Sequence, residues 1–77
     1  MIQPEEVIQL IQMDMPDAQV EITDKTGMND HYRIKVLSKA FTGKNPLDRH
    51  RMVYDAVGPA MQTGRLHAIE ITTLIPE

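Results

Sequence analysis

The apolar positions of the first sixteen residues follow a helical period. Val7, Leu10 and Ile11 recur at the spacing that places them on one face of an α-helix. Proline suits the first helical position, so the helix is expected to begin at Pro4. It is expected to end near Asp14, because Pro16 cannot continue a helix. The pattern therefore predicts one amphipathic helix of about ten residues.

From residue 18 the period changes to two. In residues 18–23 Ala, Val and Ile alternate with Gln, Glu and Thr, and in residues 31–36 Tyr, Ile and Val alternate with His, Arg and Lys. Such alternation is typical of half-buried strands. The segment Asp-Lys-Thr-Gly at residues 24–27 has the composition of a turn. These two strands are expected to pair as an antiparallel hairpin.

A second helix is predicted to start at Asn45, a good N-cap, with Pro46 in the first helical position. Its expected buried stripe consists of Leu47, Val53, Tyr54 and Val57. Gly58-Pro59 should then cause a kink or start a fresh short helix that ends at Gly64. A last strand is expected from Leu66 to about Leu74.

This order of elements predicts an α+β fold in which helices cover one face of a three-stranded sheet. Seventy-seven residues are expected to form a single domain, residues 1–77. Such a short chain has little room for separate substrate and cofactor lobes, and no motif of a hydrolase or transferase is present. We therefore expect a binding or adaptor protein and not an enzyme.

The chain contains no cysteine, which excludes disulfides and any metal site built from its own thiolates. Glu5 and Glu6 stand where a targeting peptide would be basic, and no apolar run is long enough to cross a bilayer. We expect a soluble protein of the cytoplasm, or of an organelle stroma or matrix if a transit peptide has been removed. No membrane partner is expected.

The net charge of −3 is unevenly distributed. Residues 1–30 contain seven acids and one base, whereas residues 33–51 contain six bases and one acid. The basic middle is either a solvated strand and helix face or a surface for phosphates or an acidic partner. Composition alone leaves both readings open.

The segment from Phe41 to Tyr54, FTGKNPLDRHRMVY, and the later Leu66-His67-Ala68-Ile69 together resemble the signature of the BolA family. The resemblance covers nearly the whole chain. It implies an α-β-β-α-α-β order with a three-stranded mixed sheet, similar to the class II KH domain. Weak homodimerisation is compatible with this reading.

The three histidines are the candidate metal ligands of ordinary strength. His67 is expected on the same strand face as Ile69 and Ile71, and His50 is expected to pack at the margin of the second helix. In the family that this chain resembles, the histidine at the position of His67 ligates a 2Fe-2S cluster shared with a monothiol glutaredoxin and its bound glutathione. His31 is the nearest candidate for a further ligand. The resemblance thus implies an adaptor in iron-sulfur cluster trafficking, iron homeostasis or the stress response.

The alternative is nucleic-acid binding, because some proteins of this family are associated with transcription regulation. Lys44, Arg49, Arg51 and Arg33 are the candidate residues for binding a partner or DNA. KH domains bring the nucleic-acid backbone close with a Gly-x-x-Gly loop, and Gly43 is the only glycine of that loop here. RNA binding without a partner is therefore not expected.

Overall fold

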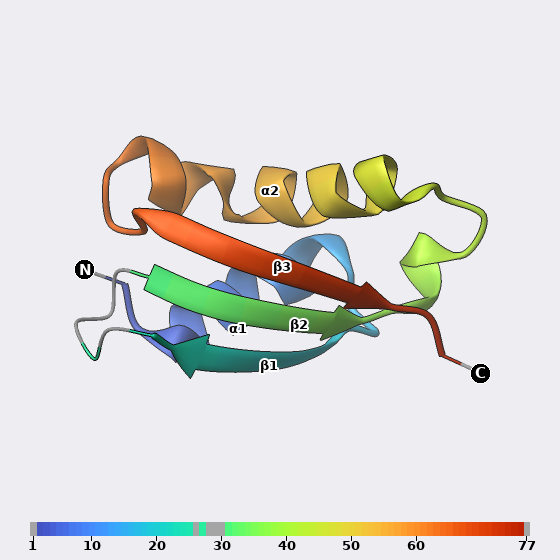
Figure 1. The fold of residues 1–77 in the computed structure, drawn as a ribbon, viewed down its shortest axis with the longest axis horizontal. Coiled ribbons are helices and arrows are strands. Elements are labelled where there is room, and N and C mark those ends of the chain that lie inside the picture. The colour runs from blue at the N-terminus through green and yellow to red at the C-terminus, as the bar shows by residue number, and fades with distance from the viewer. Residues whose placement is uncertain (1, 26, 28–30, 77) are drawn as a thin grey trace.

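The computed structural model describes residues 2–25, 27 and 31–76. Its elements, in chain order and labelled in Figure 1, are α1 (Pro4–Asp14), β1 (Gln19–Asp24), β2 (His31–Leu37), the 3-10 turn η1 (Lys39–Phe41), α2 (Pro46–Gln62) and β3 (Ala68–Leu74). The predicted α+β class is confirmed. None of the described helices combines the length and the apolar composition that crossing a membrane requires.

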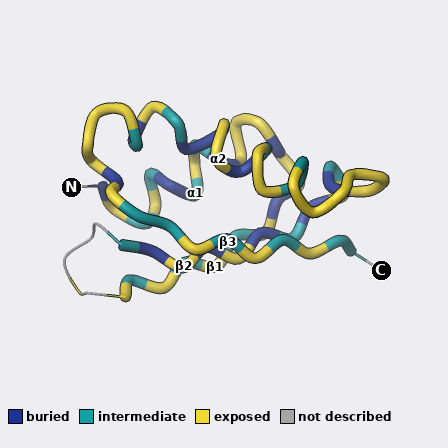
Figure 2. Tube along the Cα trace, turned by 45° about the horizontal axis from the view of Figure 1, so that its top comes forward, coloured by how far each residue is buried: buried dark blue, intermediate teal, exposed yellow. Residues whose placement is uncertain are grey.

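The sheet is mixed and has the order β1-β2-β3. β1 pairs antiparallel with β2, from Gln19 opposite Leu37 to Asp24 opposite Tyr32, so the predicted hairpin is confirmed. β3 runs parallel to β2 on its other side. Both helices cover the same face of this sheet and leave the other face open (Figures 1 and 2).

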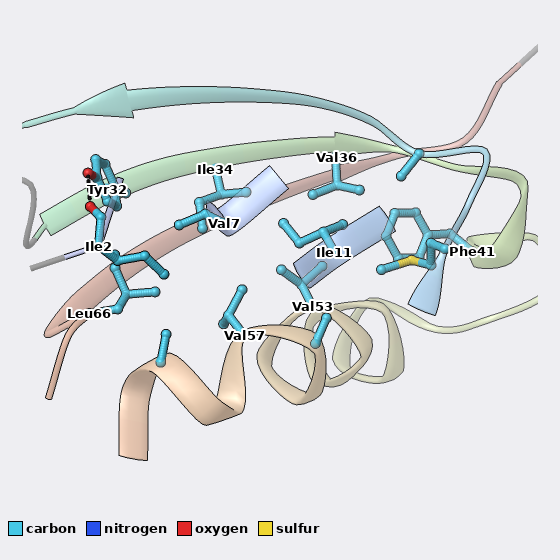
Figure 3. Packing of buried hydrophobic residues seen from close by; sticks show 14 residues of the cluster. Ile2, Val7, Ile11, Tyr32, Ile34, Val36, Phe41, Val53, Val57 and Leu66 are labelled. Carbon is cyan, nitrogen blue, oxygen red and sulfur yellow. Dashed lines mark hydrogen bonds between the residues drawn. The ribbon is translucent and has the colours of Figure 1, made fainter. Parts of the chain in front are cut away.

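The core lies between the sheet and the two helices. It includes three side chains of β2 that alternate toward the helices, and residues from both helices and from η1 (Figure 3): Tyr32, Ile34, Val36, Val7, Ile11, Val53, Val57 and Phe41. All of these are fully buried. The alternation along β2 is therefore the pattern that separates the core face from the open face.

The ends of α1 agree with the prediction. Pro4 occupies the first turn with two glutamates, where carboxylates favour the positive end of the helix dipole. The helix closes where the Met15 backbone N–H donates to the Ile11 carbonyl over 2.9 Å, directly before Pro16.

The start of α2 is also confirmed, because the Asn45 side-chain oxygen accepts a hydrogen bond of 2.8 Å from the Asp48 backbone N–H. The helix then continues without interruption through Pro59 to Gln62. A fresh short helix after Gly58-Pro59 is thus absent from the described chain. At the C-terminal end the Thr63 hydroxyl donates to the Pro59 carbonyl over 3.1 Å.

The predicted buried stripe of α2 is wrong for two of its four residues. Leu47 is 60% exposed and Tyr54 is 44% exposed. They are seven residues apart and therefore lie on one side of the helix, whereas the buried face is formed by Val53, Ala56, Val57 and Ala60. Ala56 and Ala60 were not expected in the buried face, because their side chains are small. Their small size lets α2 approach the core closely.

Candidate functional site

The first strand residues of β2 and β3 meet at one end of the sheet, near the N-terminus of the chain (Figure 1). His31 is paired with Ala68, and His67 comes directly before Ala68. Since the two strands are parallel, their starting ends lie side by side. The structure therefore brings the backbones of His31 and His67, the two predicted ligand residues, together at this end of the sheet.

His67 is exposed and lies one residue before β3. The expected strand start at Leu66 is two residues too early, because β3 begins at Ala68; Leu66 is nevertheless buried, and Ile69 also packs against the core. Two inward side chains three residues apart cannot follow the strand period of two, so alternation begins only at Ala68. This break allows the His67 side chain to reach solvent. His31 is partly exposed, on the open face of the sheet.

The backbone before His67 is held by hydrogen bonds from three parts of the chain. The Arg65 and Leu66 N–H groups both donate to the Ala60 carbonyl, over 3.0 and 3.1 Å. The Ile2 N–H donates to the Arg65 carbonyl over 3.1 Å, and the Tyr32 hydroxyl donates to the Ile2 carbonyl over 2.8 Å. His67 thus follows a segment that β2, α2 and the N-terminus fix together.

The histidines fit a partial ligand set. Within the described residues no group of three or more His, Asp or Glu side chains is close enough to hold a metal ion. Imidazole nitrogens can replace thiolates on one iron of a 2Fe-2S cluster, whose remaining ligands are then sulfur. His31 and His67 would thus make up only part of such a ligand set.

Arg33 lies on the open face of the sheet, where it shares one acid, Glu70, with Lys25. Its Nε is 3.3 Å from Glu70 Oε2, and Lys25 Nζ is 2.9 Å from the same oxygen. Hydrogen bonds from Lys25 and then Arg33 lower the pKa of Glu70. Lys35 and Glu21 form a further pair at 3.7 Å. Of the six bases in residues 33–51, Arg33 and Lys35 are therefore paired with acids across the strands.

Lys44, Arg49 and Arg51 lie at the start of α2, at the end of the molecule opposite to the start of β3 (Figure 1). Arg49 Nε donates to the Lys44 carbonyl over 2.8 Å. The ion pairs found among the described residues involve none of these three cations. The structure thus separates them both from Arg33 and from His67. His50, expected to pack, is exposed instead.

One charged residue near His67 was not predicted. Arg65 Nη2 forms an ion pair with Glu6 Oε2 of α1, and both side chains are about half exposed. Fifty-nine residues separate the two partners, so no local pattern connects them. The one sequence feature that could have pointed to Arg65 is its position, since it is a cation two residues before His67.

Comparison with known proteins gives the family. The sequence model of the BolA family, described as BolA-like protein, matches residues 7–77. The chain is 29% identical to an uncharacterized protein, RP812, of Rickettsia prowazekii over 95% of this chain and 94% of that one. It is 38% identical to the chloroplastic protein BOLA1 of Arabidopsis thaliana over 68% of this chain, which spans about a third, 32%, of that relative.

Comparison of the fold with solved structures leads to the same family. The structure of BolA1 from Arabidopsis thaliana superposes with a TM-score of 0.84 at 28% identity, over 97% of this chain and 95% of that one. The structure of a BolA homologue from Coxiella burnetii superposes with a TM-score of 0.81 at 30% identity, over 99% and 94% of the two chains. The sequence match and the shared fold agree, and the chain belongs to the BolA family.

Proposed function

We propose that this protein is an adaptor that binds a monothiol glutaredoxin and co-ligates a shared 2Fe-2S cluster through His67. The role would lie in cluster trafficking or in iron and redox regulation. The observation that carries the proposal is the exposed His67 at the start of β3, next to the backbone of His31. Catalysis is no part of this proposal.

The donor set supports the division of ligands between two proteins. A 2Fe-2S cluster takes four ligands besides its sulfides, commonly thiolates, and this chain has no cysteine. It can therefore contribute only imidazoles, with the thiolates supplied by the glutaredoxin and its glutathione. A neutral imidazole in place of a thiolate raises the reduction potential of such a cluster. His67 would be the principal ligand, and His31 is the candidate for a second one.

The test is to mix the protein with a monothiol glutaredoxin, glutathione, iron and sulfide, and to record visible absorption and circular dichroism. We expect a spectrum different from that of the glutaredoxin homodimer, and we expect it to be lost with His67→Ala. His50→Ala is the matched control, because His50 is also exposed but lies on α2. Wild-type spectra identical to those of the glutaredoxin alone would refute the proposal.

His31→Ala, measured in the same way, tests the second ligand. A changed spectrum at unchanged heterodimer formation would support ligation by His31. A spectrum identical to that of the wild type would assign the remaining position to the partner side.

Nucleic-acid binding is the second candidate function, and it depends on the basic start of α2. Lys44, Arg49 and Arg51 are not neutralised by ion pairs within the described chain, in contrast to Arg33. Binding through phosphates would weaken steeply with salt. Gel-shift titrations of duplex DNA at two salt concentrations, with Arg51→Ala and His67→Ala, separate the candidates: only the arginine variant should weaken DNA binding.

A further inference from the structure

β3 forms one edge of the sheet, and its outer side has no partner strand in the described chain. The Ser38 N–H donates to the Leu74 carbonyl over 3.1 Å, so the backbone of Leu74 faces β2. Because backbone groups point to alternate sides along a strand, Ile69, Ile71 and Thr73 direct their N–H and C=O groups outward. None of the hydrogen bonds outside the helices and strands of the described chain involves these groups. The edge can therefore accept a further strand.

The sequence of β3, AIEITTL, does not protect this edge. Sheet edges are usually protected by proline, lysine or a bulge. β3 contains neither proline nor lysine, and it pairs with β2 in an unbroken register of seven residues. Its one charged residue, Glu70, is paired with Lys25 and Arg33. The edge thus lacks the features that discourage strand pairing, which indicates that it is available to a partner.

Apolar side chains of α2 follow a stripe along the helix. Leu47, Tyr54 and Met61 are seven residues apart, which places them on one side of α2. Pro59 lies on the opposite flank, about 200° around the helix axis from Met61, and it lines a depression that α2 shares with α1. The stripe therefore faces away from α1.

This stripe lies beside the outer edge of β3. α1 packs against β1 and α2 packs against β3, so the flank of α2 that faces away from α1 is on the outer side of β3. Figure 1 shows α2 beyond that edge. We call the apolar residues of both elements the edge strip; two are exposed and three are half-buried: Leu47, Tyr54, Met61, Ile69 and Ile71. A further strand on β3 would cover them.

The position of α2 excludes the β3 strand of a second copy as that further strand. Antiparallel pairing of two β3 strands would put both α2 helices on the same face of one continuous sheet. Neighbouring strands lie about 4.8 Å apart, whereas packed helices need about 8–10 Å between their axes. Since each α2 lies over and beyond the outer edge of its own β3, the two helices would overlap. The edge therefore suits an extended segment that carries no helix above it.

We infer that the edge strip binds an extended peptide segment of another protein, which adds a strand to β3 and directs alternate apolar side chains toward Tyr54 and Met61. Main-chain hydrogen bonds would supply affinity, and the alternate side chains would supply specificity. Arg51 is four residues after Leu47 and three before Tyr54, and the ion pairs found among the described residues do not involve it. The segment should therefore carry an acidic residue beside Arg51. His67 is not part of the strip, so the inference is independent of the proposed function.

The first experiment selects the peptide from a library. Random octapeptides displayed on phage are selected on the wild-type protein, because an octapeptide covers the seven residues of β3. We expect enriched sequences with apolar residues at alternate positions and an acidic residue near one end. If no peptide is enriched, or if the enriched peptides lack the alternation, the inference is overturned.

The second experiment tests strand addition. An enriched peptide is synthesised, and its dissociation constant is measured by fluorescence anisotropy. Methylation of the backbone nitrogen at every second residue removes the donors that face β3 in one version of the peptide, and the donors that face solvent in the other. One version should bind about tenfold more weakly, equivalent to about 1.4 kcal/mol, and the other should stay within about threefold of the parent peptide. Equal affinities of the two versions overturn the inference.

Variants of the protein test the α2 side of the strip. Tyr54→Gln should weaken binding of the parent peptide about tenfold, whereas Met13→Gln, which alters an exposed apolar residue of α1, should stay within about twofold of the wild type. Helices tolerate glutamine, and urea unfolding verifies that the variants are folded. Arg51→Gln should weaken the parent peptide but not a version with an amide in place of its acidic residue. A loss in Tyr54→Gln no larger than in Met13→Gln, or an Arg51→Gln loss that ignores the acidic residue, overturns the inference.

Single-stranded DNA and a second copy of the chain are the competing occupants. Single-stranded nucleic acid binds best where several aromatic rings accompany a row of cations, whereas the edge strip has one ring, that of Tyr54. If a short single-stranded DNA displaces the parent peptide, the strip is a nucleic-acid site and the inference is overturned. A wild-type homodimer in sedimentation that Tyr54→Gln dissociates overturns it as well. A monomeric protein whose bound peptide DNA does not displace supports it.

Discussion

The buried hydroxyl of Tyr32 provides a sharp test of how the segment before His67 is held. The hydroxyl donates to the Ile2 carbonyl over 2.8 Å, and the Ile2 N–H in turn donates to the Arg65 carbonyl. Both Tyr32 and Ile2 are fully buried. Tyr32→Phe removes this donor. The Ile2 carbonyl then loses its hydrogen bond from the tyrosine at a site that bulk water does not reach.

Leaving a buried acceptor without its donor costs about 1–3 kcal/mol. We expect Tyr32→Phe to lower the free energy of unfolding by about 1–2 kcal/mol, because the ring still fills its site in the core. A protein of this length typically has about 4–12 kcal/mol in total, so the loss is readily measured. With a urea m-value of about 1 kcal/mol/M, the unfolding midpoint should fall by about 1–2 M.

The assay is urea unfolding followed by far-ultraviolet circular dichroism. Tyr54→Phe is the matched control, since it removes the same hydroxyl from a side chain that is 44% exposed. The control should change stability by less than about 0.5 kcal/mol. Equal midpoints for the two variants would refute the reasoning. Hydrogen exchange should also show faster exchange at the Ile2 amide in Tyr32→Phe.

Two further predictions concern loops that position the elements. Hydrogen bonds from the Lys39 N–H and then the Ser38 hydroxyl lower the pKa of Asp17. These bonds therefore stabilise the folded state above the unfolded pKa of about 4, and the stabilisation is lost as the pH falls through the lower folded pKa. The gap in urea midpoint between the wild type and Asp17→Asn should therefore be larger at pH 7 than at pH 3, and a gap independent of pH would contradict this account. Asn45→Ala should cost about 1 kcal/mol in the same assay, because it removes the cap of α2, whereas Asn45→Asp should retain most of the stability; equal losses in the two variants would exclude the cap as the cause.

Local sequence rules predicted the boundaries of the elements well. Pro16 and the Asn45-Pro46 pair act through the backbone itself, so the end of α1 and the start of α2 follow without knowledge of the tertiary structure. The alternation of β1 and β2 likewise needs only the strand period. These features are confirmed because their causes lie within a few residues.

The orientation of α2 was not predictable in the same way. Leu47 and Tyr54 are larger and more apolar than Ala56 and Ala60, and size alone assigned them to the core. The structure buries the alanines instead, since the helix must approach α1 and the sheet closely. The ion pair of Arg65 with Glu6 was missed for a related reason: it depends on the approach of two helical ends that are distant in sequence.

The placement of the candidate ligands depends on how β3 pairs. In a parallel arrangement β3 must start where β2 starts, which sets His67 beside His31. An antiparallel pairing would instead have placed His67 near Leu37, at the end of the sheet where α2 begins. The length of α2 favours the observed choice, because its seventeen residues span about 25 Å and the seven residues of β2 span about 23 Å. A helix of this length returns the chain along the whole strand, and this return brings the two histidines to the same end of the sheet.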